Sequence, residues 1–426
     1  MKRVVILCVW LFSVVAGHAQ LSLDECRRLA RENYPEIRQY DLVHQTEQYN
    51  LSNAARAWIP QIAFSAQATW QTDAPNFPKE LTGMLAQQGL EIPGLRKDQY
   101  KVALELNQTI WDGGKSVADK RIARAEAAEQ KTMTDVDLYE LEGRVDDLYF
   151  GILLLDERIA QTNLTLNLLR SNLEKVRALQ RNGVAMQSDA DVLEAELLSV
   201  GQQLIQFESS CDSYRRMLGI FIVQKVGDRK LQRPSAVQPL SGESARPELA
   251  MFAAKIDRLT AQEKMVKSSS MPRLGFFAQG YYGYPGLDYM QSMMNSDWSW
   301  NAMLGVKLSW NFGAYYTQKN NLNKLRISRQ QVEVQRDVFL FNMNLQAAQE
   351  NGDIARLRKA IADDDRIVAL RRSVREAAES KLRNGIIDTH DLLSKITDES
   401  TASMARSMRE IELLKAIYEY KHTINR

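Results

Sequence analysis

Two aspartates stand at equivalent places beyond a repeated asparagine–glycine pair. Asn182-Gly183 is followed by Asp189, and Asn384-Gly385 is followed by Asp391, each time six residues after the glycine. Glycine and asparagine tolerate the left-handed backbone conformation that ends a helix. A nearby hydroxyl or carboxylate can then cap the next helix. The pattern predicts two helical hairpin turns, capped by Ser188 or Asp189 in the first and by Asp388 or Thr389 in the second.

Other reactive side chains form no catalytic or metal-binding motif. Gly113-Gly114-Lys115-Ser116 ends like a phosphate-binding loop, but that motif requires a glycine where the chain has Thr109. Beyond His18, the histidines stand too far apart to form a zinc motif. The methionines of residues 290–294 suit soft metal ions, although an apolar loop tip is the simpler interpretation. We therefore expect no enzyme, no cofactor and no metal site.

The N-terminus has the pattern of a secretory signal. Lys2 and Arg3 precede an apolar run, and small residues lead to a cleavage site after Ala19, so residues 1–19 are the predicted signal peptide. An uncleaved anchor is the alternative, but the run is too short to span a bilayer. Cys26 and Cys211 follow this segment, and we interpret them as buried thiols, with a disulfide bridge as the alternative.

Charge and hydropathy argue against a nucleic-acid-binding protein and against a protein with membrane-spanning helices. The formal net charge is +2, and it falls to zero when Lys2 and Arg3 leave with the signal. Without a basic cluster, nucleic-acid binding is not expected. No apolar stretch of helix-spanning length follows the signal. Any membrane role must therefore use strands.

Four segments alternate between apolar and polar residues. Aromatic residues stand near the ends of the alternating runs, as in strands that face lipid. Two hairpins of a soluble sandwich would explain any single run, but four runs that each adjoin a very long helix favour a membrane protein. The segments are residues 62–70, 100–107, 274–282 and 300–311, with outward loops at 71–99 and 283–297.

The remaining chain predicts long helices. Residues 115–180 lack proline and repeat apolar residues at steps of three and four, which is typical of a coiled-coil seam. Such a helix is about 100 Å long. A counterpart at 315–383 has a seam that is interrupted by Gly352 and by the aspartates of 363–365. Further helices are expected at residues 22–57, 189–221 and 247–268, and from 388 to the C-terminus.

The sequence predicts two structural repeats. Ile110-Trp111-Asp112 in the first half corresponds to Ser309-Trp310-Asn311 in the second. The repeats are residues 20–221 and 247–426, and a linker with two prolines joins them at 222–246. Four strands cannot close a barrel with a usable lumen, since about eight strands give only a filled interior. Three chains would supply twelve strands, so we expect a homotrimer.

The sequence resembles the TolC family of outer membrane efflux proteins. The segments that carry the resemblance are LSLDECRRLARENYPEI, WIPQIAFSA, LNQTIWDGG, LSWNFG, and the sequences DVLEAE and DLLSK after the two glycines. The resemblance implies a mainly α fold with a β-barrel part. Long coiled-coil helices form an α-barrel tunnel, and four transmembrane β-strands per protomer build a twelve-stranded barrel in the trimer. It also implies the outer membrane of a Gram-negative bacterium, with helices that extend into the periplasm.

The resemblance also assigns roles to residues. It implies that a periplasmic membrane fusion (adaptor) protein docks at the two tips, through Asn182, Gly183, Val184, Asn384, Gly385 and Ile386. Asp391 would belong to an acidic ring at the closed tunnel mouth, and Asp189 holds the corresponding place in the first half. Family members latch the mouth with a tyrosine and an arginine where this chain has Leu382 and Ile387. Arg383 and His390 are candidate substitutes.

The expected function is therefore an exit duct. It would serve a tripartite efflux or type I secretion system, together with an inner membrane transporter of the RND, ABC or MFS type and with outer membrane lipid around the strands. A soluble periplasmic coiled-coil adaptor or scaffold is the alternative, because it also needs long helices. Recovery in the detergent-free periplasmic fraction would favour the scaffold. The transported substrate does not follow from the sequence.

Overall fold

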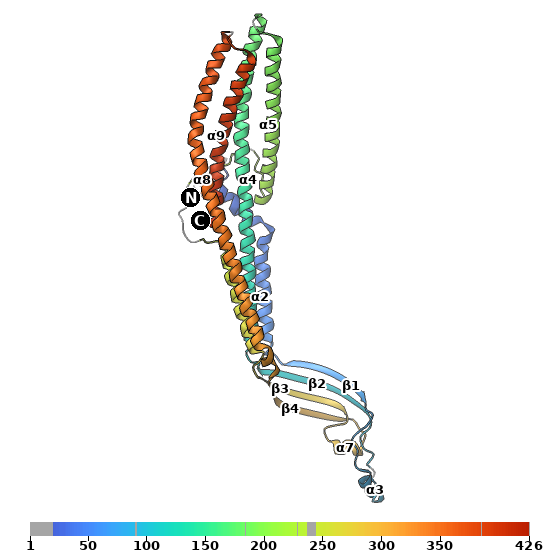
Figure 1. Ribbon diagram of the computed structural model, residues 1–426. Helices are drawn as coiled ribbons and strands as arrows, with labels where there is room; N and C mark the ends of the chain where they lie inside the picture. Colours follow the sequence, from blue (N-terminus) through green and yellow to red (C-terminus); the bar gives the residue numbers. More distant parts are fainter. Residues whose placement is uncertain are drawn as a thin grey trace, which may run out of the picture. The chain divides into compact units, whose positions relative to one another are not determined.

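We describe a computed structural model of the chain (Figure 1), which covers residues 20–89, 92–183, 185–227, 229–236, 244–384 and 386–425. The predicted signal peptide lies outside these residues. The chain divides into two compact units, each built from segments of both halves of the sequence. The sheet unit is Asp41–Lys131 and Phe252–Val334, and the helical unit is Met1–Tyr40, Thr132–Met251 and Gln335–Arg426.

The sheet unit contains the four predicted strands in one antiparallel sheet with the order β1-β2-β3-β4. The register places apolar residues opposite one another, for example Ile62 opposite Leu106 and Ala278 opposite Leu304. Side chains of paired residues lie on the same face of the sheet. The alternating patterns of the four strands therefore combine into one apolar face and one polar face. The strands are β1 Gln61–Trp70, β2 Asp98–Trp111, β3 Arg273–Tyr284 and β4 Ser299–Ser309.

The two faces of the sheet differ in what they leave exposed. On the apolar face, Phe64 is 73% exposed, Leu304 is 75% exposed and Trp300 is 82% exposed. On the polar face, Lys101 donates to Gln279 (3.1 Å), which donates in turn to Glu105 (2.6 Å). Large exposed apolar side chains on one whole face mark a surface that contacts lipid or protein rather than water.

Two predicted loops contain short helices. α3, Lys79–Gln87, lies within the first loop and α7, Tyr289–Met294, lies within the second. Asp288 starts α7 by accepting a hydrogen bond from the backbone N–H of Gln291 (3.0 Å). Both segments were predicted only as loops, since helices this short leave no clear periodicity.

The longest helices have nearly the predicted bounds. α4, Lys115–Arg181, has 67 residues and α8, Gly313–Arg383, has 71 residues. Each contributes to both units. The interrupted seam of α8 does not break the helix, because its charged residues find partners on the last helix: Asp365 pairs with Arg406 (2.8 Å) and Asp364 pairs with Arg409. Among the described residues, no helix combines the length and apolar character that crossing a membrane would require.

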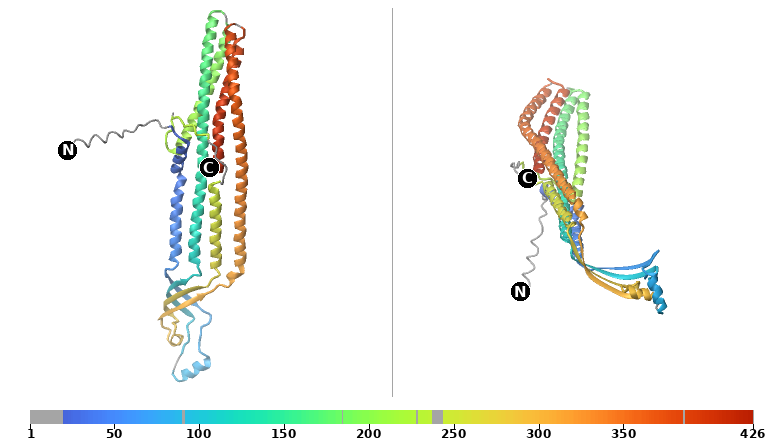
Figure 2. Two further views of the ribbon diagram at one scale, coloured as in Figure 1. Left: turned by 90° about the vertical axis from the view of Figure 1, so that its left-hand side faces the viewer. Right: turned by 60° about the horizontal axis from the view of Figure 1, so that its bottom comes forward.

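The remaining helices complete both units. One prediction was wrong: residues 22–57 are not a single helix, because Pro35 lacks the N–H that a continuous helix needs. Figure 2 shows the hairpin of α4 and α5 beside that of α8 and α9. The helices are α1 Leu23–Asn33, η1 Pro35–Arg38, α2 Gln39–Arg56, α5 Gln187–Ile222, α6 Pro247–Ser268 and α9 Thr389–Ile424.

The main core of the helical unit joins α1, α4, α5 and α9. Tyr149 is fully buried there, and its hydroxyl donates to the backbone carbonyls of Leu21 (2.8 Å) and Gln232 (2.6 Å). Cys26 and Cys211 are both buried and free, as interpreted from the sequence. Burial raises the pKa of the Cys26 thiol to about 12, so this side chain acts as a small apolar group.

His422 makes the stability of the helical unit depend on pH. Its ring stacks on Tyr139 with 4.1 Å between centroids. Burial, together with the nearby charges of Arg246 and Arg27, lowers the pKa of His422 to about 4. The unfolded chain, in which histidine titrates near 6.5, therefore binds more protons below neutral pH. The stabilisation is complete above about pH 6.5 and is lost as the pH falls toward about 4.

We expect the free energy of unfolding to fall by up to about 3 kcal/mol between pH 7 and pH 4 through His422 alone. Urea unfolding at a series of pH values measures this loss. Carboxylates titrate in the same range, so His422→Phe, which keeps a ring on Tyr139 but cannot be protonated, is the control. Equal pH slopes for the two proteins would contradict the role of His422.

Candidate functional site

The first hairpin turn has the predicted glycine geometry. Gly183 adopts a positive φ of 73°, and its N–H donates to the carbonyl of Gln180 (2.9 Å). Asn182 precedes it in the turn, and Val184 lies outside the described residues. α5 begins at Gln187 and its N-cap residue is Met186, so neither Ser188 nor Asp189 is the N-cap. Asp189 instead sits inside the first turn and accepts the N–H of Met186 (2.8 Å).

The second turn differs in its cap. Asn384 donates its N–H to the carbonyl of Ser380 (3.3 Å), and Ile386 donates to Lys381 (2.9 Å). Gly385 lies outside the described residues. Asp388 caps α9 by accepting the N–H of Asp391 (2.8 Å). Between the two predicted alternatives, Asp388 and Thr389, the structure therefore selects Asp388.

The two equivalent aspartates consequently differ. One carboxylate oxygen of Asp189 is committed to the backbone of Met186. Asp391 is exposed, and within the described part of the chain its carboxylate accepts no hydrogen bond and forms no ion pair. The Asp391 carboxylate at the second tip is therefore free to interact with ions, whereas the Asp189 carboxylate also stabilises the first turn of α5.

The two latch positions hold apolar residues that pack inward. Leu382 and Ile387 contact a buried cluster formed by α4, α5, α8 and α9 near the tips, which includes Leu173, Leu193 and Leu392. The two hairpins thus share one apolar core in this region. Of the candidate polar substitutes, neither Arg383 nor His390 makes a side-chain hydrogen bond or an ion pair to any described residue.

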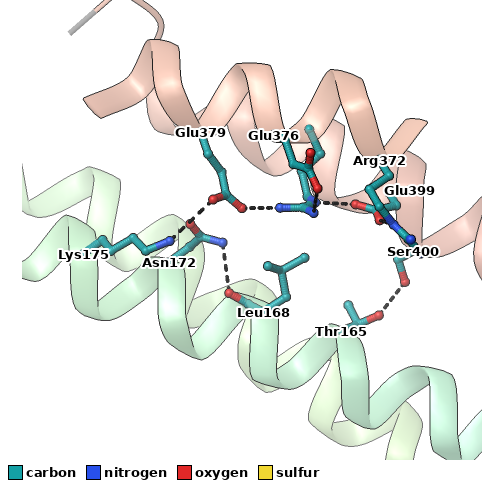
Figure 3. Close-up of polar contacts among 10 residues, drawn as sticks. Thr165, Leu168, Asn172, Lys175, Arg372, Glu376, Glu379, Glu399 and Ser400 are labelled. Atoms are coloured by element: carbon teal, nitrogen blue, oxygen red, sulfur yellow. Dashed lines mark hydrogen bonds and ion pairs between the residues drawn. The ribbon is translucent and has the colours of Figure 1, made fainter. Parts of the chain in front are cut away.

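A network of ion pairs joins the hairpins instead (Figure 3). Lys175 on α4 pairs with Glu379 on α8 at 3.5 Å. Glu379 also accepts a hydrogen bond from Arg375 (2.5 Å), and Arg375 extends to Glu399 on α9. Arg372 binds the same Glu399 carboxylate at 3.2 Å. We call Lys175, Arg372, Arg375, Glu379 and Glu399 the interhairpin network.

The guanidinium at the centre of the interhairpin network stays charged. Only 14% of the Arg375 side chain is exposed. Burial acts to lower its pKa, but the hydrogen bonds that Arg375 donates to Glu399 and Glu379 outweigh burial and raise the pKa above its ordinary value. An ion pair this well enclosed is screened less by salt than a surface pair. Removal of one partner would leave a charge uncompensated.

Hydroxyl groups add a second tie between the hairpins. The hydroxyls of Thr165 on α4 and Ser400 on α9 share a hydrogen bond of 2.5 Å (Figure 3), and Gln161 donates to Ser407 at 3.2 Å. Hollows of about 370 and 410 Å³ flank this contact. Thr162 is buried beside it, and its hydroxyl has no hydrogen-bond partner among the described residues. Specific polar contacts therefore add to the shared apolar core between α4 and α9.

The interhairpin network was not predicted from the sequence. Lys175 and Glu379 each lie about two helical turns before their glycine, but charges on a long helix usually face solvent. The available signal was the concentration of arginine and glutamate in residues 371–379 on a helix whose partner carries Glu399. Pairing across hairpins requires the relative rotation of the helices, which the sequence does not specify.

The sheet, with one exposed apolar face and one polar face, has the pattern of outer membrane β-barrel strands, in which lipid-facing and lumen-facing residues alternate. Residues 27–218 match the family model of outer membrane efflux proteins. The resemblance to outer membrane efflux proteins that the sequence predicts is confirmed by that match.

Solved structures support the fold over nearly the whole chain. The outer-membrane channel OprN is 14% identical with a TM-score of 0.69, covering 94% of this chain and 89% of that one. VceC from Vibrio cholerae is 14% identical with a TM-score of 0.67, covering 94% and 95%. The MtrE channel of Neisseria gonorrhoeae is 13% identical with a TM-score of 0.64, covering 94% and 88%. No curated protein sequence matches the chain.

Proposed function

We propose that three copies of this chain form the outer membrane exit duct of an efflux machine. The observation that carries the proposal is the open four-stranded sheet, whose order leaves β1 and β4 as edges in the described structure. A sheet edge cannot face hydrocarbon because its backbone groups would lack partners. Four strands do not enclose a lumen, and eight fill it with side chains, so twelve is the smallest closed set with a water-filled passage.

The mass of the detergent-extracted protein tests the assembly. Native mass spectrometry should give three times the mass of one chain, and reconstitution into planar bilayers should give ion-conducting pores. A monomer or dimer that withstands dilution would contradict the trimer. A protein recovered from the periplasm without detergent would contradict the membrane assignment.

The tips are the part of the duct that an adaptor would contact. Ile386 is 67% exposed although it is large and apolar, which suits a surface that another helix covers. Asn384 lies in the same turn, Asn182 and Gly183 lie in the turn between α4 and α5, and Val184 and Gly385 complete the proposed docking set. The partners are a periplasmic adaptor and, through it, an inner membrane transporter. The sequence repeats at 20–221 and 247–426, with the linker at 222–246, would give each protomer two such tips.

Asp391 is the proposed gate carboxylate, with Asp189 as the corresponding residue of the first tip. Three symmetry-related carboxylates in a narrow mouth would concentrate cations and raise one another's pKa. The free carboxylate of Asp391 supports its role. The interhairpin network is the proposed latch, since it ties together hairpins that would have to separate when the mouth opens.

Asp391→Ala should weaken the block of the pore by hexaamminecobalt(III). We expect the half-blocking concentration to rise about tenfold or more, because a trivalent cation would lose three carboxylates at once. Single-channel recording in planar bilayers measures this concentration. Asp189→Ala is the matched control and should change it less, since that carboxylate is engaged with Met186. Unchanged block in Asp391→Ala would remove Asp391 from the gate.

A further inference from the structure

The polar face of the sheet has a hollow of about 610 Å³ near the start of α4, and all of its walls belong to the sheet unit. The residues of interest on its walls are Glu105, Lys115, Arg273, Phe277 and Lys307. A hollow of this volume accommodates a small organic molecule. Neither the family match nor the proposed gate assigns a role to it.

Two cations in the hollow are uncommitted. Lys115 pairs with Asp119 at 2.8 Å. Glu105 accepts a hydrogen bond from Gln279. Arg273 and Lys307, in contrast, are exposed and form no ion pair with any residue that the structure describes.

The strand register places these two cations close together. Arg273 lies opposite Ser309, and Lys307 lies opposite Gly275 on the same pair of strands. The two basic residues are therefore diagonal neighbours on one face of the β3–β4 ladder, within reach of one ligand for side chains of this length. Two adjacent cations without a carboxylate partner favour an anion.

Phe277 gives the hollow an aromatic surface. A Cβ atom built on Gly305, directly across from Phe277 on β4, would lie 2.9 Å from the phenyl Cε1. The ring therefore lies over a position where any side chain would displace it. Phe277 shares the polar face with Gly275 and Gln279, and it is the diagonal neighbour of Lys307 there, so an aromatic ring stands beside one of the two cations.

We propose that this hollow binds organic anions that carry one aromatic ring system and one carboxylate or sulfonate. Arg273 and Lys307 bind the anionic group through charge-assisted hydrogen bonds. Phe277 contacts the ring of the ligand in an offset or edge arrangement. This inference rests on the proposed function, because it takes the polar face to line the passage that cargo crosses. The hollow gives the duct a preference for aromatic anions among the compounds that reach it.

Equilibrium dialysis tests the site with naphthalene-2-sulfonate as the probe. The full trimer in a non-ionic detergent is dialysed against the probe, with protein-free micelles as the blank. We expect saturable binding of one probe per chain. Arg273→Gln and Lys307→Gln should each weaken the affinity about tenfold, the effect of losing one charge-assisted hydrogen bond. Phe277→Leu should remove the preference for this probe over methanesulfonate.

A control variant and a cationic control ligand distinguish a specific binding site from general electrostatic attraction to the polar face. Lys101→Gln removes a cation from the same face, but Lys101 contacts Gln279 and Tyr281 rather than the hollow. It should change the affinity less than about twofold. Equal weakening by Lys101→Gln, saturable binding of 2-naphthylmethylammonium, or no saturable binding of the sulfonate would each overturn the proposal. Dialysis requires no conducting pore, so a protein that fails to conduct contradicts only the proposed function.

Discussion

Leu304→Arg is expected to abolish assembly in the outer membrane. Leu304 lies in the middle of β4, is 75% exposed and faces away from the polar ladder. In a lipid-facing position near the bilayer midplane, arginine costs about 2–4 kcal/mol. Three copies per trimer multiply this cost, so we expect the folded trimer to fall below detection. Heat-modified gel mobility and urea resistance of outer membrane fractions measure the amount of trimer.

Met303→Arg is the control for Leu304→Arg. The two residues are neighbours on the same strand, but Met303 lies opposite Gln279 on the polar face. An arginine there would remain hydrated, so trimer formation should be nearly normal. Equal loss of trimer in both variants would mean that β4 tolerates no bulk or charge at all. Equal tolerance of both would mean that the apolar face does not contact lipid.

Glu379→Ala should open the pore. Glu379 is the carboxylate through which Lys175 on α4 and Arg375 on α8 meet, so its removal leaves two cations facing each other across the hairpins. Loss of one partner from an enclosed ion network costs about 1–3 kcal/mol, which corresponds to a roughly 5- to 150-fold increase in the open population. Planar bilayer recordings measure this change as mean conductance and open time.

Glu376→Ala provides the comparison for Glu379→Ala. Glu376 lies on the same helix and contacts Arg375 at 3.5 Å, but 62% of its side chain is exposed and it does not reach the other hairpin. Its removal should leave the conductance nearly unchanged. If Glu379→Ala conducts like the unmodified protein, the interhairpin network is not the latch. The apolar contacts of Leu382 and Ile387 would then be the remaining tie.

Local periodicity explains what could be predicted. The four strands followed from an alternation of period two, and the bounds of α4 followed from a proline-free repeat of apolar residues. The single helix expected at residues 22–57 did not take account of Pro35, which begins η1 between α1 and α2. The choice of Asp388 over Thr389 as a cap depends on a difference of one residue in where α9 begins, which periodicity does not resolve.

The site could be predicted only in part. The two glycine turns follow from residue types that favour a left-handed backbone, and Gly183 has the expected φ. The different engagement of Asp189 and Asp391 could not be predicted, because it depends on a turn that is built differently in the two halves. Arg375 and Glu399 come together through the packing of α8 on α9, and contacts of that kind are set by the rotation of whole helices.

The edges of the sheet also constrain how the protein is made. β1 and β4 each present a row of backbone donors and acceptors that, in the part of the chain the structure describes, no neighbouring strand satisfies. In the proposed trimer, a newly exported chain could therefore not complete its insertion alone, because its two sheet edges would stay unpaired until other copies arrive. The rate of trimer formation should therefore rise more steeply than in proportion to the amount of exported chain. A cell that makes too few chains would accumulate protease-sensitive precursors rather than small pores.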